Sequence, residues 1–561
     1  MQLFSKSKLI LIIIFLIALC FRLFGLNWDQ GQHLHPDERF LTMVASDIKL
    51  PKNIFEYFDT ASSPLNPYNY SNYQFFVYGT FPLFLTKVIS SLFNQDNYQF
   101  VHLWGRGLSA LFDSFNVFLL FFLARKVFPK KSKLVFLPSL FYAFCVLPLQ
   151  LSHFFAVDTF LTTFVLATFT AMAYGLFPLA AFFFGLALSC KISTLYFLPI
   201  IIFFLFRYFL KTKNLFQILS TIFICLPITF FTFRFFQPYN FVGFFKLNPQ
   251  FIDNFKTLKT FSDPSASFPP SVQWLSKIPL LFSLQNIVLW GLGLPLSVLF
   301  LLSLLKTKFS KLPYLITFSA IWILLLYFYQ GSQFAHTMRY FLPIYPFLCL
   351  TIGYLSAKLN FKILAVFLIF HIFGAVCFLS IYFRPHSRIQ ASTWIYQNIP
   401  QSSVITSEYW DDALPLPLPG YNFIYPNETL AFYDPESPSK WQKINQSLAL
   451  SDYLIMSSNR LWGSIPLASQ QYPQTSKFYQ DLFSEKLNFK KVIEINSYPG
   501  LFLPFFKKCY YLGPTNYPGI KNLWFAVDQN CFYPGIYFRD DTAEEAFTVY
   551  DHPKILIFRR I

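Results

Sequence analysis

A group of charged residues stands directly after the first apolar run, in the stretch HLHPDERFLTMVASDI that begins at His33. It places Asp37 and Glu38 beside Arg39, with His35 two residues before Asp37. A carboxylate beside an arginine keeps its charge and can accept a proton, so this group could supply a general base. The alternative is a solvated loop with a helix cap, which is the usual role of such a cluster.

Further ionisable residues fall at the ends of apolar runs. The stretch GRGLSALFD holds Arg106 and Asp113, which are seven residues apart and therefore share a face of a helix. Ionisable groups in or against a membrane are costly and tend to mark functional cavities, although each could also reach the interface by snorkelling. We expect them to meet on one side of the membrane. The other members of this set are His153 and Asp158 in HFFAVDTF, Lys191 and Arg339.

The composition indicates a membrane protein. Of 561 residues, 55% are hydrophobic and 13% are charged, whereas a soluble protein has roughly 25% charged residues. From residue 384 onward 16 basic and 16 acidic residues cancel, and the first 383 residues hold 28 basic and 11 acidic ones, so 28 − 11 gives the whole net charge of +17. This placement argues for membrane topology and anionic lipid, not for nucleic acid.

The apolar runs predict a polytopic α-helical membrane protein with about eleven spans. The first run is interpreted as an uncleaved signal anchor. The predicted spans are Leu9–Leu26, Gly107–Leu123, Leu134–Leu151, Thr159–Leu176, Phe177–Cys190, Thr194–Tyr208, Leu215–Phe233, Ile287–Leu305, Leu312–Tyr329, Phe341–Ala357 and Phe361–Phe383.

Charge supports this count. With a cytosolic N-terminus, the cytosolic loops contain 15 basic and no acidic residues: Lys6, Lys8, Arg125, Lys126, Lys130, Lys131, Lys133, Arg207, Lys211, Lys213, Lys306, Lys308, Lys311, Lys358 and Lys362. Cytosolic loops carry such an excess of lysine and arginine. We therefore predict a multi-pass protein of the plasma (inner) membrane with its C-terminus outside.

Residues 1–383 form the predicted membrane module, with long outer loops at 27–104 and 234–286. In the first loop, Phe75–Phe93 is predicted to be an interfacial helix. Residues 384–561 predict an outer α/β domain, with helices in ASTWIYQNI and KFYQDLFSEKL and strands in SVITSE, DYLIMSS and KKVIEINSY. The last segment, AFTVYDHPKILIFRR, is predicted to be two short strands around a turn.

Two of the eight cysteines, Cys509 and Cys531, lie in the outer domain. They are 22 residues apart, and a disulfide closing the turn-rich loop between them would stabilise it by about 3 kcal/mol. The alternative is a pair of free buried thiols. No CxxC pair is present, so a zinc site is not expected.

The order of these features resembles a known family. A first helix, a long outer loop opening with HPDERF, an interfacial helix, GRGLSALFD, a basic turn and HFFAVDTF are similar to the GT-C class of lipid-carrier-dependent glycosyltransferases. The similarity covers roughly residues 1–380 and is greatest to bacterial relatives of protein mannosyltransferases and aminoarabinose transferases.

The resemblance implies roles for individual residues. Asp37 would be the catalytic base, with Glu38 beside it, and Asp158 would shape the site and help to hold the acceptor or a metal. A divalent cation, if one is bound, would lie at Asp37 and Asp158, and no other cofactor is implied. Residues implied to bind the lipid phosphate are Arg39, Arg106, Lys191 and Arg339, and His35, Asp113 and His153 are further cavity candidates.

The prediction from the sequence is a glycosyltransferase that moves a sugar from a polyprenyl-phosphate donor to a lipid, glycan or protein acceptor on the outer face. One alternative is a transporter whose path is lined by Arg106, Asp113 and Asp158, although transporters usually show paired repeats. The other is a membrane-anchored receptor or envelope assembly protein with an outer ligand-binding domain.

Overall fold

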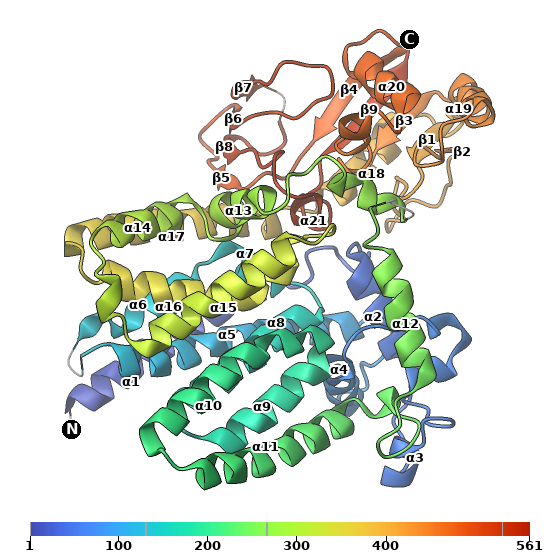
Figure 1. Cartoon of the computed structure of the whole chain (residues 1–561). Coiled ribbons are helices and arrows are strands. Elements are labelled where there is room, and N and C mark those ends of the chain that lie inside the picture. The colour runs from blue at the N-terminus through green and yellow to red at the C-terminus, as the bar shows by residue number, and fades with distance from the viewer. Residues whose placement is uncertain (1, 130–131, 265–267, 530) are drawn as a thin grey trace.

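The computed structural model describes residues 2–129, 132–264, 268–529 and 531–561. A bundle of helices carries a C-terminal part that contains two β-sheets (Figure 1). The predicted fold class, a helical chain with a C-terminal α/β part, is confirmed. The bundle helices are α1 (Gln2–Leu23), α5 (Val101–Val127), α6 (Leu137–Ala143), α7 (Val146–Leu151), α8 (Val157–Ala173), α9 (Phe177–Cys190), α10 (Leu198–Thr212), α11 (Leu215–Phe236), α13 (Leu281–Asn286), α14 (Leu294–Leu305), α15 (Tyr314–Gly331), α16 (Tyr345–Ser356) and α17 (Phe361–Leu379).

All eleven predicted spans are helical over most of their length, but two are not straight. The segment Leu134–Leu151 divides into α6 and α7, and the segment Ile287–Leu305 bends by 112° before α14. Gly293 permits this bend because its φ of +85° suits glycine, and Pro295 then starts α14.

Five helices of the described residues are long and apolar enough to cross a membrane, and the bent pair makes six. The helix α8 is buried at every residue, whereas α11 exposes Phe223 by 79% and Leu226 by 64%. A buried centre with an apolar exterior suits a lipid environment, because large apolar patches are not left open to water. The count of eleven spans stays a prediction, and Lys130 and Lys131 lie outside the described residues.

The two loops predicted to lie outside contain helices of their own, α2 (Pro36–Asp47), α3 (Ile54–Phe58), α4 (Thr80–Leu92) and α12 (Pro249–Thr260). The predicted interfacial helix corresponds to α4, which packs one face against α5 and α9. Gly79 starts it by donating its N–H to the Cys190 carbonyl over 3.1 Å, and a Cβ at Gly79 would lie 2.2 Å from that oxygen. Glycine is therefore required here to bring α4 against the end of α9.

The C-terminal part contains a five-stranded sheet of order β2-β1-β3-β9-β4 and a four-stranded sheet of order β5-β8-β6-β7. In the first sheet β1, β2 and β3 are parallel and β9 is antiparallel to both neighbours. The strands are β1 (Ile405–Glu408), β2 (Asn427–Leu430), β3 (Tyr453–Met456), β4 (Phe489–Ile495), β5 (Gly500–Phe502), β6 (Cys509–Leu512), β7 (Phe525–Asp528), β8 (Gly535–Phe538) and β9 (Ile555–Arg560). The helices are α18 (Ser387–Asn398), α19 (Pro438–Leu450), α20 (Pro473–Phe483) and α21 (Glu545–Thr548).

The two faces of the first sheet join different cores. Leu454 and Leu556 belong to a core inside the C-terminal part, whereas Ile455 and Ile557 belong to the core that continues into the helical bundle. Because side chains alternate along a strand, β3 and β9 bury both faces, which explains their continuous apolar sequences.

The last segment differs from its prediction. Only its second half is a strand, β9, while the first half forms the short helix α21 and the turn after it. Phe547 in α21 lies 5.5 Å from the Phe378 ring of α17, between ring centroids. Packing against the bundle, and not pairing with a strand, therefore decides the conformation of this half.

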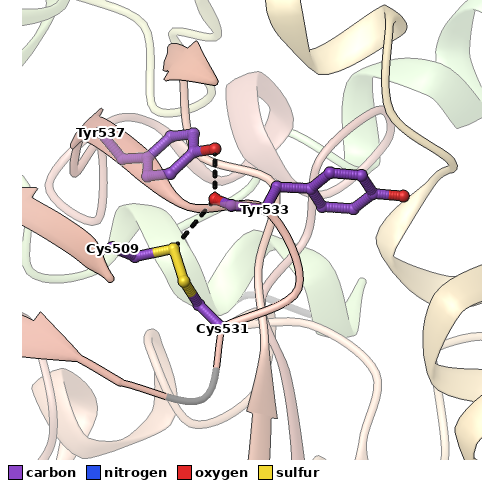
Figure 2. Close-up of a disulfide and its surroundings, with 4 residues drawn as sticks. All are labelled: Cys509, Cys531, Tyr533 and Tyr537. Atoms are coloured by element: carbon purple, nitrogen blue, oxygen red, sulfur yellow. Dashed lines mark hydrogen bonds between the residues drawn. A yellow bond between two sulfur atoms is a disulfide. The ribbon is translucent and has the colours of Figure 1, made fainter. Parts of the chain in front are cut away.

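Cys509 and Cys531 are joined by a disulfide, with their Cα atoms 6.0 Å apart (Figure 2). The Tyr533 carbonyl accepts the Tyr537 hydroxyl proton over 2.7 Å and lies 3.0 Å from the Cys509 Sγ. The bond closes the β6–β7 hairpin onto the start of β8.

Candidate active site

Asp37 lies in the first turn of α2. Pro36 is the first residue of α2, and the His35 side chain caps the helix by accepting the Glu38 N–H over 3.3 Å. Proline and a side-chain cap both suit a helix start, so the local sequence itself sets the position of Asp37.

The carboxylate of Asp37 forms an ion pair with Arg339, and each side chain remains about a quarter exposed (23% and 26%). Tyr78, just before α4, also bonds to this carboxylate. Burial raises the pKa of Asp37, but Arg339, His35 and the Tyr78 bond outweigh it and hold the pKa below its ordinary value. Asp37 is therefore ionised and in contact with a cation at neutral pH.

Asp158 lies in the first turn of α8, where the helix dipole favours a negative charge. Its carboxylate accepts from the Lys191 ammonium over 3.2 Å. Lys191, at the end of α9, is 30% exposed and sits 4.2 Å from the centre of the Tyr340 ring. This second pair is thus also reachable from one side.

The two pairs are neighbours. Burial lowers the pKa of the Arg339 guanidinium, but the negative charges of Asp37 and Asp158 both raise it. The Tyr340 ring lies beside both Arg339 and Lys191. Four segments far apart in the sequence therefore bring two carboxylates and two cations together.

The C-terminal part adds residues that were not predicted for the site. The Tyr550 ring lies 4.2 Å from the His35 ring, between centroids, and its hydroxyl is influenced by Asp37 and Arg339. Burial, with help from Asp37, raises the pKa of Tyr550 to about 12 against the effect of Arg460. The sequence predicted only two short strands and a turn in this last segment, and nothing in it indicated contact with residues near position 37.

Glu544 also contacts the Arg339 segment. It accepts the Met338 N–H, and its own N–H donates to the Asn286 side chain over 2.9 Å. Burial raises the pKa of Glu544 to about 7, although hydrogen bonds from Thr337 and Met338 oppose the rise. The C-terminal part therefore supports the segment that carries Arg339.

Arg106 and Glu38 do not fit their predicted roles. The two side chains are fully buried and form an ion pair with each other, and Arg106 also pairs with Asp29 at 2.9 and 3.0 Å. The Leu26 carbonyl takes a further Arg106 N–H, and Glu38 also accepts the Phe155 N–H over 2.7 Å. All five guanidinium N–H groups are engaged, so Arg106 has no donor left for a lipid phosphate.

Asp113 does not face the predicted cavity either. It accepts from the Arg22 Nε over 2.6 Å, and both side chains are fully buried. Its other oxygen accepts the Tyr142 hydroxyl proton over 2.6 Å. Asp113 and Arg106 share a helix but serve separate networks. The sequence gave no indication that Arg22 pairs with Asp113, because the two residues are 91 positions apart.

The two histidines have local structural roles. His153 is buried, with its ring nitrogens 2.8 and 2.9 Å from the Leu149 and Phe24 carbonyl oxygens. His35 is buried as the cap of α2, close to Asp37 but committed to the Glu38 N–H.

Arg39 points toward the C-terminal part. Its guanidinium donates to both Asp412 oxygens at 3.0 and 3.1 Å and to the His33 carbonyl over 2.7 Å. Arg388 holds the same Asp412 carboxylate at 2.8 Å. Arg39 therefore ties the first loop to the C-terminal part and does not join Arg339 and Lys191.

Among the described residues there is no group of three His, Cys, Asp or Glu side chains placed to hold a metal ion. Asp37 and Asp158 each already face a cationic side chain. A divalent cation at these two residues stays a prediction.

No family model matches the chain, and no curated protein matches its sequence. Among solved structures it is similar to ArnT from Cupriavidus metallidurans bound to undecaprenyl phosphate, with 12% identity and a TM-score of 0.43 over 83% of this chain and 95% of that one. It is also similar to the archaeal oligosaccharyltransferase AglB from Archaeoglobus fulgidus in complex with an inhibitory peptide and a dolichol-phosphate, with 13% identity and a TM-score of 0.47 over 84% of this chain and 72% of that one.

Likeness at these identities and scores assigns no function, so the chemistry of the site has to carry the functional argument. The site offers an ionised carboxylate that can accept a proton, and two cations that can stabilise a phosphate.

Proposed function

We propose that the protein is a membrane glycosyltransferase that moves a sugar from a polyprenyl-phosphate donor to an acceptor on the outer face of the membrane. The observation that carries the proposal is the meeting of Asp37, Arg339, Asp158 and Lys191, all partly exposed or next to exposed groups. Replacing a phosphate at an anomeric carbon requires a base for the acceptor and cations for the leaving group, and these four residues supply both.

Asp37 is the proposed base. In the free enzyme Arg339 satisfies its charge, which keeps the carboxylate ionised but weakly basic. When the donor phosphate binds Arg339 and Lys191, it takes over part of the interaction between Arg339 and Asp37. The Asp37 carboxylate then becomes more basic. It then takes the proton from the acceptor hydroxyl as the acceptor oxygen bonds to the anomeric carbon. The bond to phosphate breaks, polyprenyl phosphate leaves as an anion, and in-line attack inverts the configuration.

The end of the bundle at which Asp37 lies supports a lipid-linked donor. In Figure 1 the N-terminus and the α10–α11 turn lie at one end of the bundle, and α2, α3 and α12 lie at the other. Lys6 and Lys8 belong to α1, and Arg207 and Lys211 belong to α10, so the first end includes basic residues of the proposed cytosolic side. Asp37 then faces away from the cytosolic pool of nucleotide sugars, and a polyprenyl carrier presents the sugar on the outer side.

Residues 1–383 are the proposed catalytic module and residues 384–561 the outer domain, in a multi-pass protein of the plasma membrane. The helix α4, with exposed Val88 and Leu92 and exposed Phe93 directly after its end, offers an apolar wall for the polyprenyl chain. The contacts of Tyr550 and Glu544 give the outer domain a part in the site.

The test uses the purified full chain with an acceptor extract and either a polyprenyl-phosphate sugar or the matching nucleotide sugar. Envelope lipids, glycans and proteins from cells with and without the intact gene identify the acceptor by mass spectrometry. We expect transfer from the lipid donor alone. Transfer from the nucleotide sugar with the lipid donor inert would contradict the proposal.

A further inference from the structure

A cavity lies between the second long loop and the C-terminal part, and none of the four residues of the Asp37 site lines it. It has a volume of about 240 Å³, and its walls come from residues around 273–285, 459–467, 516 and 541–545. We call it the loop–domain cavity. Drug-sized ligands occupy about 300–1,000 Å³, so this cavity suits a smaller molecule.

Four of the polar side chains that line the cavity are neutral amides. Gln273 and Gln285 come from the outer loop, and Asn459 and Asn516 come from the C-terminal part. An amide group both donates and accepts, which matches a hydroxyl group of a ligand. The half-buried Phe282 ring adds an apolar surface beside them.

Two buried oxygens in this lining lack a hydrogen-bond partner among the described residues. They are Asn459 Oδ1 and Glu545 Oε2. The Glu545 side chain is 9% exposed, and its other oxygen accepts from Arg460 Nε over 2.7 Å. A buried acceptor without a partner is costly, so a ligand in the cavity whose donors reached these two oxygens would remove that cost.

The charges narrow the class of ligand. The lining contains two cations, Lys277 and Arg460, and two carboxylates, Asp541 and Glu545, so its formal charges cancel and a neutral ligand is favoured over an ion of either sign. A phosphate would suit Lys277, but a fully ionised phosphate has no proton to give to the two acceptor oxygens. Arg460 is also already used by Glu545 and by the Trp410 carbonyl. A neutral molecule with several hydroxyl groups satisfies all of these groups.

We propose that the loop–domain cavity binds one sugar unit of a glycan. This inference rests on the proposed function in one respect, namely that the bound unit belongs to the acceptor. The cavity sits beside α21, the helix whose neighbours Glu544 and Tyr550 reach the Asp37 site. A glycan held there by one unit would extend toward Asp37 with another. The acceptor class would then be a carbohydrate chain, not a bare lipid or peptide.

The direct test is saturation-transfer NMR with methyl glycosides of glucose, mannose, galactose and N-acetylglucosamine. The full chain is placed in lipid nanodiscs free of sugar-based detergent. Asn459→Ala and Gln285→Ala remove amide groups from the cavity, and Asn445→Ala and Gln446→Ala are matched controls on the exposed side of α19. We expect at least one glycoside to bind and each cavity variant to weaken binding about fivefold, as for the loss of one hydrogen bond.

The controls should bind as the unchanged protein does. Absence of glycoside binding, equal binding in the cavity variants and their controls, or binding of inorganic phosphate or short peptides in place of glycosides would overturn the proposal. Asp37→Asn separates the two hypotheses, because it should abolish transfer and leave glycoside binding unchanged. If the unchanged protein transfers no sugar but binds glycosides at the cavity, the proposed function fails and the sugar site stands.

Discussion

Two sets of ion pairs in this protein are made of the same residue types but have different roles. Arg106 with Asp29 and Glu38 is fully buried, whereas Asp37 with Arg339 remains about a quarter exposed. In the buried set every guanidinium N–H of Arg106 has a partner within the protein, so the network ties α5 to the first loop. In the exposed set a ligand can replace one partner. The two sets have the same kinds of charge and similar positions at helix ends. They differ in the exposure of their side chains to solvent.

Asp37→Asn gives the largest expected effect. It keeps the shape of the side chain and removes the proton acceptor, so transfer should fall by about 100- to 10,000-fold, the usual contribution of a general base. Expression should stay close to that of the unchanged protein, and loss of the part-exposed ion pair with Arg339 should cost at most about 1 kcal/mol in the free energy of unfolding. The measurement is initial rate with the lipid donor.

Asp253→Asn is its matched control, because Asp253 forms an exposed pair with Lys256 on α12. It should leave the rate unchanged. Near-normal transfer by the Asp37 variant would remove Asp37 from the mechanism.

Arg106→Met tests the buried set. It leaves Asp29 and Glu38 as buried charges without their cation, which should cost about 3–5 kcal/mol in the free energy of unfolding. Thermal unfolding and folded yield in detergent measure the effect. Arg39→Met breaks the half-exposed pair with Asp412 and should cost at most about 1 kcal/mol. Similar losses in both variants would mean that exposure does not distinguish the pairs.

Glu544 provides a pH test of the contact between the C-terminal part and the Arg339 segment. Its folded pKa of about 7 lies above its ordinary value of 4.5, so the folded state holds the proton more tightly. The resulting stability is fully present below pH 4.5, declines as pH rises and is lost above pH 7, a change of about 3 kcal/mol. From pH 5 to pH 8 the Tm of the full chain should therefore fall relative to the Tm of Glu544→Gln, and the difference between the two pH profiles measures the contribution of Glu544.

Asp37 works in the opposite direction. Its folded pKa is lowered, so its contribution is present above its ordinary value of 3.8 and is lost only in stronger acid. Asp37→Asn should therefore leave the pH 5–8 profile unchanged. A profile that Asp37→Asn alters and Glu544→Gln does not would contradict this assignment of the two groups.

The smallest expected effect separates two arginines that looked alike in the sequence. Arg339→Lys keeps the charge but loses the paired N–H groups that hold a phosphate, so the KM for the lipid donor should rise about tenfold. Arg39→Lys should leave this KM unchanged, because Arg39 faces Asp412. Equal effects on KM would return Arg39 to the phosphate site.

The organisation of the chain was largely predictable. Apolar runs and the placement of lysine and arginine predicted helices at all eleven segments, because each signal is local in sequence. The broken segment Ile287–Leu305 was missed, since a φ of +85° at Gly293 leaves little trace in hydropathy. The conformation of α21 was missed for another reason, namely that contact with α17 outweighs local β propensity.

The candidate site was predictable in part. The sequence by itself determined that Asp37 begins a helix after a long apolar run, and that charged residues occur at the ends of several such runs. Only the tertiary structure decided which of them meet. It paired Asp37 with Arg339 across 302 positions, enclosed Arg106 between Asp29 and Glu38, and brought Tyr550 against His35. Partner choice and exposure depend on packing between distant segments, and an ion pair buried on all sides has the same local sequence as one open to a ligand.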